Sequence, residues 1–117
     1  MTSSKNYTPD APSRSEVDTT KGPLVIEFGT NWCGICQGAQ PSITQALQQH
    51  ADVPHLKIED GPGRPLGRSF KVKLWPTLIV LLDGVEVARV VRPGNADVIH
   101  EALLLARGPG RAPTVGA

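Results

Sequence analysis

This chain of 117 residues has little of several features that mark other classes of protein. Its net charge is only +1, from 12 basic and 11 acidic residues, so nothing argues for nucleic acid or an anionic membrane as partner. No stretch approaches the roughly 18 apolar residues of a membrane span. Residues 1–12 are polar and lack the apolar centre of a secretory signal. We therefore expect a cytoplasmic protein with no membrane or nucleic-acid partner.

The length suits one domain, and 39% hydrophobic residues are enough for a modest core. The 12 glycines and 11 prolines gather at the two ends and between elements. We predict a flexible N-terminal tail over residues 1–12, a folded domain over 13–107 and a flexible C-terminal tail over 108–117.

Cysteine is scarce as well: the only two are Cys33 and Cys36, between the apolar run 24–28 and a helical pattern. A strand, a Cys-x-x-Cys turn and a helix together put a thiol at a helix N-terminus. Unpaired N–H groups and the helix dipole there favour the thiolate form of Cys33, the nucleophile of disulfide exchange. Cys36 lies one turn further on, so the pair can close a ring, taking up two electrons and returning them.

Other interpretations of the pair are weaker. A structural zinc site needs four ligands, but there is no second cysteine pair, and His50, His55 and His100 show no ligand spacing. A structural disulfide across so short a loop would constrain little of the unfolded chain. Redox chemistry is therefore favoured, with metal binding as the main alternative.

Local patterns predict alternating helices and strands. The capping-box spacing of Ser13 and Glu16 starts a short helix, and Asp83-Gly84 is typical of a hairpin turn. The predicted strands cover residues 24–28, 55–59, 77–82 and 85–91. The other predicted helices run from the cysteines to about His50 with Pro41 inside, over 65–70, and from the cap Asn95 to Gly108-Pro109.

Several short motifs in this order resemble the thioredoxin family over roughly residues 15–107. They are Glu27-Phe28, the Trp32-Cys33-Gly34-Ile35-Cys36 segment, Pro41, Trp75-Pro76-Thr77 and Asp83-Gly84. The resemblance implies an α/β, thioredoxin-like three-layer fold, with a central mixed sheet of four to five strands flanked by helices. It also implies a thiol-disulfide oxidoreductase that reduces protein disulfides.

The resemblance further implies catalytic roles for three residues. Cys33 would attack the substrate disulfide, and Cys36 would resolve the mixed disulfide. Glu27 stands where the family often has a buried acid, and with a pKa raised by desolvation it would accept the proton of Cys36. The alternative is that its strand simply turns Glu27 toward an edge and water.

Six residues are expected to bind substrate on the same grounds: Trp32, Gly34, Ile35, Trp75, Pro76 and Arg92. Pro76 matches the family's cis-proline, which leaves the backbone of Trp75 free to pair with an extended substrate. Ile35 stands where thioredoxins usually have proline, and Arg92 where they commonly have a glycine lining the groove. Gly29 replaces a common aromatic residue beside the active-site turn.

The second half of the chain has a basic bias, from Arg64, Arg68, Lys71, Lys73, Arg89 and Arg92. Around the groove these residues would attract acidic substrates, whereas a solvated basic face is the simpler interpretation.

No flavin or nicotinamide fingerprint is present, so we expect no cofactor beyond a redox-active Cys33–Cys36 disulfide. Electrons would come from an external donor such as a reductase, and the protein is expected to be a monomer. Two alternatives without redox turnover stay open: a binding module of the same fold, and a metal-binding protein. An oxidase or isomerase role would use the same chemistry as the reductase.

Overall fold

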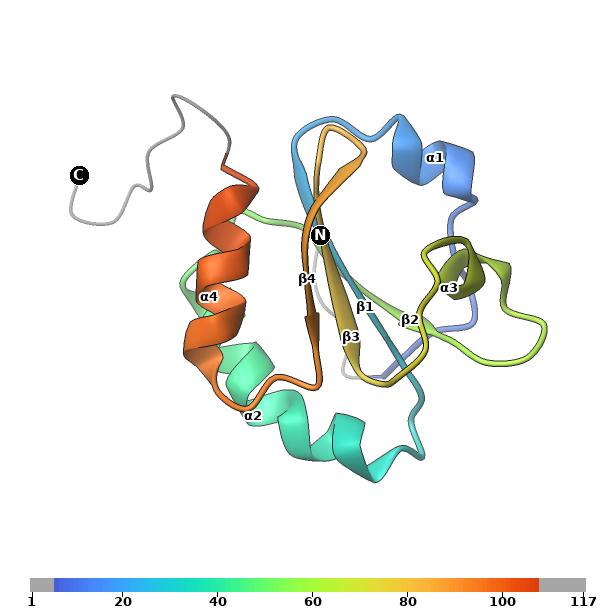
Figure 1. Ribbon diagram of the computed structural model, residues 1–117, viewed down its shortest axis with the longest axis horizontal. Coiled ribbons are helices and arrows are strands. Elements are labelled where there is room, and N and C mark those ends of the chain that lie inside the picture. Colours follow the sequence, from blue (N-terminus) through green and yellow to red (C-terminus); the bar gives the residue numbers. More distant parts are fainter. Residues whose placement is uncertain (1–5, 108–117) are drawn as a thin grey trace.

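A computed structural model of the protein describes residues 6–107, which form a four-stranded mixed sheet with helices on both faces (Figure 1). The strand order is β2-β1-β3-β4. In chain order the elements are α1 (Arg14–Asp18), β1 (Pro23–Gly29), α2 (Gly34–Gln48), β2 (His55–Glu59), α3 (Pro65–Ser69), β3 (Thr77–Leu82), β4 (Val85–Val91) and α4 (Ala96–Leu105). The predicted three-layer fold is confirmed.

The sheet combines one parallel and two antiparallel pairings. β1 pairs in parallel with β2, with Glu27 opposite Lys57, and antiparallel with β3. β3 and β4 form the hairpin predicted from Asp83-Gly84. Because β1 and β2 are parallel, the chain crosses over between them through α2. The carboxyl end of β1 leads to the cysteines, so the active-site turn is anchored on the sheet.

Strand alternation divides the core into two clusters. Val25 faces α2 and α4, whereas Ile26 and Phe28 face α1 and α3. Figure 1 shows these two pairs of helices on opposite sides of the sheet. Each fully buried aliphatic or aromatic side chain contributes about 1.5–3 kcal/mol. Glu27 shares the face of Val25 and is therefore enclosed beneath α2.

The helix signals match the sequence closely. Ser13 and Glu16 form the complete capping box of α1, and Asn95 Oδ1 accepts from the N–H of Val98 at 3.1 Å. Pro41 lies inside α2. α4 ends at Leu105, whereas the stop predicted at Gly108-Pro109 lies outside the described residues.

The N-terminal boundary differs from the prediction. Tyr7 is only 5% exposed, and Thr8 forms a parallel bridge to Ile58 of β2. A flexible tail over residues 1–12 is therefore wrong for these two residues, which belong to the folded domain. The predicted C-terminal tail, 108–117, lies outside the described residues, as do residues 1–5. Between residues 6 and 107, no helix has the length and apolar character needed to cross a membrane.

Candidate active site

Cys33 caps the N-terminus of α2 and is the accessible member of the cysteine pair. Its backbone is extended, and its Sγ accepts a 3.2 Å hydrogen bond from the N–H of Cys36. Unpaired N–H groups of the first helical turn favour negative charge at this position. Both cysteines are free thiols, Cys33 partly exposed and Cys36 buried. A disulfide from outside therefore reaches Cys33 first.

Cys36 is held as a neutral thiol. Burial, and then the hydrogen bond with Cys33, raise the pKa of Cys36 to about 11. A thiol with this pKa is almost fully protonated at neutral pH. It needs a base before its sulfur can attack, and that base has to lie on the buried side of the pair.

Glu27 is the acid beneath the cysteines, and its side chain is fully buried. Its Oε2 accepts hydrogen bonds from the Tyr7 hydroxyl and, at 2.9 Å, from Gln40 Nε2. Its Oε1 lies 2.9 Å from Nε2 of His55. The alternative in which Glu27 points to water is therefore excluded, and three side chains fix its carboxyl group.

These hydrogen bonds reverse the expected direction of the pKa shift. Burial alone raises the pKa of Glu27, but the bonds from His55, Tyr7 and Gln40 together lower it below the usual range. The prediction of a raised pKa is therefore wrong in direction, because it counted desolvation without the partners. Glu27 is a carboxylate at neutral pH and can accept a proton.

Four members of this network were not found from the sequence: Tyr7, Gln40, His55 and Lys57. Lys57 Nζ donates to Gln40 Oε1 at 2.9 Å and lies 4.7 Å from the centre of the Tyr7 ring. The alternation of β2 puts His55 and Lys57 on one face, which was a usable signal. Gly29, the small residue beside the active-site turn, was a weaker signal for Tyr7.

The outer rim of the site is apolar. Trp32 is 74% exposed, Ile35 is exposed, and the rings of Trp32 and Trp75 meet edge to face with centroids 5.7 Å apart. Gly34 is exposed beside them, and the peptide bond between Trp75 and Pro76 is cis. The structure thus brings five of the six predicted binding residues to one end of the sheet, next to Cys33.

Arg92, the sixth, reaches the same place from the end of β4. Its Nε donates to the carbonyl oxygen of Trp75 at 2.9 Å. The backbone of Trp75 was expected to be free for substrate, and its carbonyl already accepts this one hydrogen bond.

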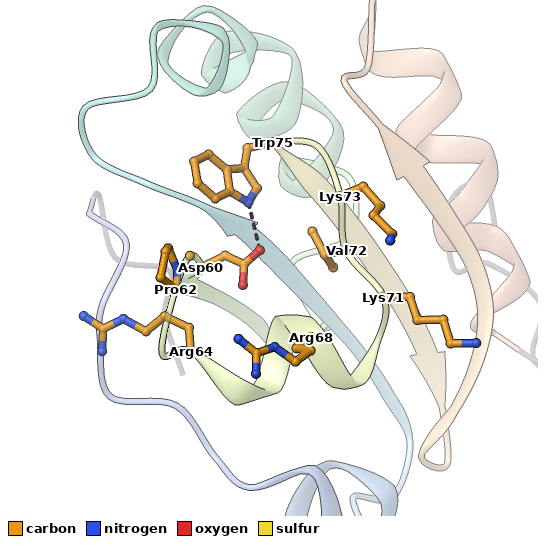
Figure 2. A pocket seen from close by; sticks show the side chains of 9 residues that line it. Asp60, Pro62, Arg64, Arg68, Lys71, Val72, Lys73 and Trp75 are labelled. Carbon is orange, nitrogen blue, oxygen red and sulfur yellow. Dashed lines mark hydrogen bonds between the residues drawn. The ribbon is translucent and has the colours of Figure 1, made fainter.

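A groove of about 620 Å³ begins at Trp75 and follows the segment after β2 (Figure 2). Trp75 donates from Nε1 to Asp60 Oδ2 at 2.8 Å, as Figure 2 shows. The groove is lined by Asp60, Gly61, Pro62, Arg64, Arg68, Lys71, Val72, Lys73 and Trp75. Four of the six basic residues singled out above line it, whereas Arg89 and Arg92 line a second groove along β4 and α4, from which the Arg92 side chain reaches the carbonyl of Trp75.

The remaining histidines pair away from the cysteines. His50 Nε2 lies 2.8 Å from His100 Nδ1, and Arg107 bridges His50 and Asp52. Within residues 6–107, no group of three or more His, Cys, Asp or Glu side chains is arranged as metal ligands.

The fold and this site define a class of protein in which a partly exposed thiol and a buried thiol share one helix turn. Comparison with known proteins gives the same class: the chain matches the Thioredoxin family over residues 6–104 and belongs to it. It is a thiol-disulfide oxidoreductase.

Individual relatives agree. Reduced thioredoxin 2 from Pseudomonas aeruginosa PAO1 is 56% identical, with a TM-score of 0.78, covering 87% of this chain and 94% of that one. A thioredoxin from Mycobacterium tuberculosis is 30% identical over 94 residues, 79% of this chain and 81% of the relative. A thioredoxin structure from Nicotiana alata is 27% identical, with a TM-score of 0.66 and 80% of each chain covered.

Proposed function

We propose that the protein reduces disulfides of partner proteins through a mixed disulfide on Cys33, which Cys36 resolves. The observation that carries this proposal is the contrast within one helix turn: an accessible Cys33 at the N-cap and a buried Cys36 above a carboxylate. Cys33 thiolate attacks one substrate sulfur, and the other leaves as a thiolate. Cys36 then attacks Cys33 Sγ, the second substrate sulfur leaves, and Glu27 takes the proton of Cys36.

The cycle leaves a Cys33–Cys36 disulfide, so an external donor has to return two electrons and two protons. A reductase or a small thiol supplies them, and no bound cofactor takes part. We place the protein in the cytoplasm as a monomer, where a reducing pool recharges the pair.

Trapping tests the order of attack. With Cys36→Ser, a disulfide substrate should accumulate as a stable adduct on Cys33, detected by mass and released by a reductant. With Cys33→Ser, the buried Cys36 should form less than about a tenth as much adduct in the same time. Equal trapping by the two variants would contradict the assigned roles.

The groove at Trp75 supports a finer proposal, that favoured substrates have an acidic segment beside their disulfide. Arg64 pairs with Glu59 at 3.2 Å, whereas Arg68, Lys71 and Lys73 have no ion pair with any residue in 6–107. Asp60, the acid in the groove, is held by Trp75. Three cations without an ion pair along the groove that begins at Trp75 would raise the local concentration of an acidic chain.

Charge reversal tests this preference. Arg68→Glu with Lys71→Glu should lower kcat/KM for a disulfide peptide with an acidic flank by about tenfold at low salt. A neutral peptide should be unaffected, and high ionic strength should remove the difference. Lys21→Glu, exposed at the opposite end of β1, is the matched control. Equal losses for the acidic and neutral peptides would mean that the groove does not select charge.

A further inference from the structure

Tyr7 fills the space beside the active-site turn that Gly29 leaves open. A Cβ atom built on Gly29 would lie 2.7 Å from Cys36 Sγ, 2.7 Å from Tyr7 Cζ and 2.8 Å from the Tyr7 hydroxyl. Any side chain at position 29 would therefore force Cys36 or Tyr7 to shift. The same contacts place the Tyr7 hydroxyl and the Cys36 sulfur around one point, so glycine at 29 keeps the space between the two groups free of a side chain.

Backbone hydrogen bonds hold Tyr7 in this position. Its N–H donates to Asn31 Oδ1 at 2.8 Å, and Asn31 Nδ2 donates back to its carbonyl at 3.3 Å. Thr8 N–H donates to the carbonyl of Lys57 at 3.0 Å, and Glu59 N–H donates to the carbonyl of Thr8 at 2.8 Å. The segment is thus an added edge of the sheet, tied to the loop that leads to Cys33.

The Tyr7 hydroxyl has the right chemistry for a link between Cys36 and Glu27. It donates its one hydrogen to Glu27 Oε2, and its oxygen can accept from the thiol of Cys36 and from Gln40 Nε2, 3.4 Å away. The phenol oxygen therefore lies close to the Cys36 sulfur and already donates to the carboxylate.

We propose that Tyr7 relays the proton of Cys36 to Glu27 during resolution. As Cys36 Sγ bonds to Cys33 Sγ, the bond from Cys33 to the substrate sulfur breaks and that sulfur leaves as a thiolate. The thiol proton passes to the Tyr7 oxygen, and the phenol proton passes to Glu27 Oε2. Tyr7 is unchanged after the step, and Glu27 holds the proton.

The protonation of Tyr7 fits a relay better than a tyrosinate base. Burial, and then the charge of Glu27, raise the pKa of Tyr7 far above its usual range, so the phenol keeps a proton at every physiological pH. Lys57 Nζ lies 4.7 Å from the centre of the Tyr7 ring, and this cation–π contact helps to hold the ring in place. The inference rests on the proton role proposed for Glu27.

One stopped-flow experiment separates the steps. The reduced protein attacks 5,5′-dithiobis(2-nitrobenzoate), and a first coloured thiolate leaves when Cys33 attacks. A second leaves when Cys36 resolves the adduct. Tyr7→Phe keeps the ring and removes the hydroxyl. We expect an unchanged first phase, a second phase at least about tenfold slower, and a second-phase pH profile that moves to higher pH.

Glu27→Gln and the double variant complete the test. Because the two groups act in one chain, the double variant should be no slower in the second phase than the slower single variant. Thr8→Val, whose hydroxyl accepts from Asp10 rather than the network, controls for disturbance of the segment. An unchanged second phase in Tyr7→Phe, with a slowed one in Glu27→Gln, overturns the relay alone. If both are unchanged, the proton role of Glu27 fails too, and a first phase that persists in Cys33→Ser would refute attack by Cys33.

Discussion

Arg92 donates a 2.9 Å hydrogen bond from its guanidinium Nε to the backbone carbonyl of Trp75. The backbone of Arg92 has a φ of +49°, and its N–H donates to the carbonyl of Pro76 at 2.9 Å. Trp75 precedes Pro76, where an extended substrate would add as a strand. Arg92 therefore already donates to one of the backbone groups that such a substrate would use.

Arg92→Gly should free this carbonyl and tighten peptide binding. We expect KM for a neutral disulfide peptide to fall by about threefold to tenfold, the value of roughly one hydrogen bond, with kcat unchanged. Glycine adopts a positive φ freely, so stability should not fall. Arg92→Ala removes the same bond but keeps a Cβ, and steady-state kinetics should show the same lower KM. An effect limited to glycine would assign it to the backbone instead.

His55 is the largest hydrogen-bonding cause of the low pKa of Glu27. His55→Phe leaves the burial of Glu27 and removes this partner, so the pKa of Glu27 should rise. A smaller fraction of Glu27 would then be ionised at acid pH. The acid limb of the pH profile for the second coloured-thiolate phase should therefore move up by about one pH unit. His100→Phe, outside the network, should leave the limb in place. An unmoved limb in His55→Phe would show that Glu27 is not the base.

Gly29→Ala should destabilise the fold, because its Cβ would press on Cys36 and Tyr7. We expect a loss of about 1–3 kcal/mol in the free energy of unfolding, measured with urea. In a Tyr7→Ala background, Gly29→Ala should cause a smaller loss in the free energy of unfolding, as a double-mutant cycle would record. Gly38→Ala, in α2 with open space around it, is the matched control and should not destabilise. A similar loss at both glycines would exclude local crowding as the cause.

The pair of His50 and His100 makes stability depend on pH. Burial, then Arg107 and His100, lower the pKa of His50 below its usual 6.5, while Asp52 opposes them. As the pH falls, the unfolded chain therefore binds a proton before the folded protein does. The stability that neutral His50 contributes is complete above pH 6.5 and is lost as the pH falls below 6.5. Urea unfolding from pH 8 to 5 should show this fall, and His50→Gln should flatten it. A constant difference between the two proteins would contradict the shift.

Local sequence was enough for most of the fold. The strands over 55–59, 77–82 and 85–91 have the predicted bounds. Short apolar or alternating runs and the Asp83-Gly84 turn depend only on residues that are adjacent in the sequence. The strand predicted over 24–28 is one residue longer at each end. Tyr7 was missed because a lone aromatic among polar residues shows no periodicity, and its partners lie elsewhere in the chain.

The sequence by itself determined the Cys33–Cys36 pair at a helix start and the acid six residues earlier, because these features belong to one strand-turn-helix segment. Only the tertiary structure decided what surrounds Glu27. Tyr7, Gln40 and His55 come from separate segments, and the pairing of β1 with β2 and the packing of α2 bring them together. The pKa of Glu27 depends on these contacts, because burial raises it and the hydrogen bonds lower it. The balance is set by partners that are distant in the sequence.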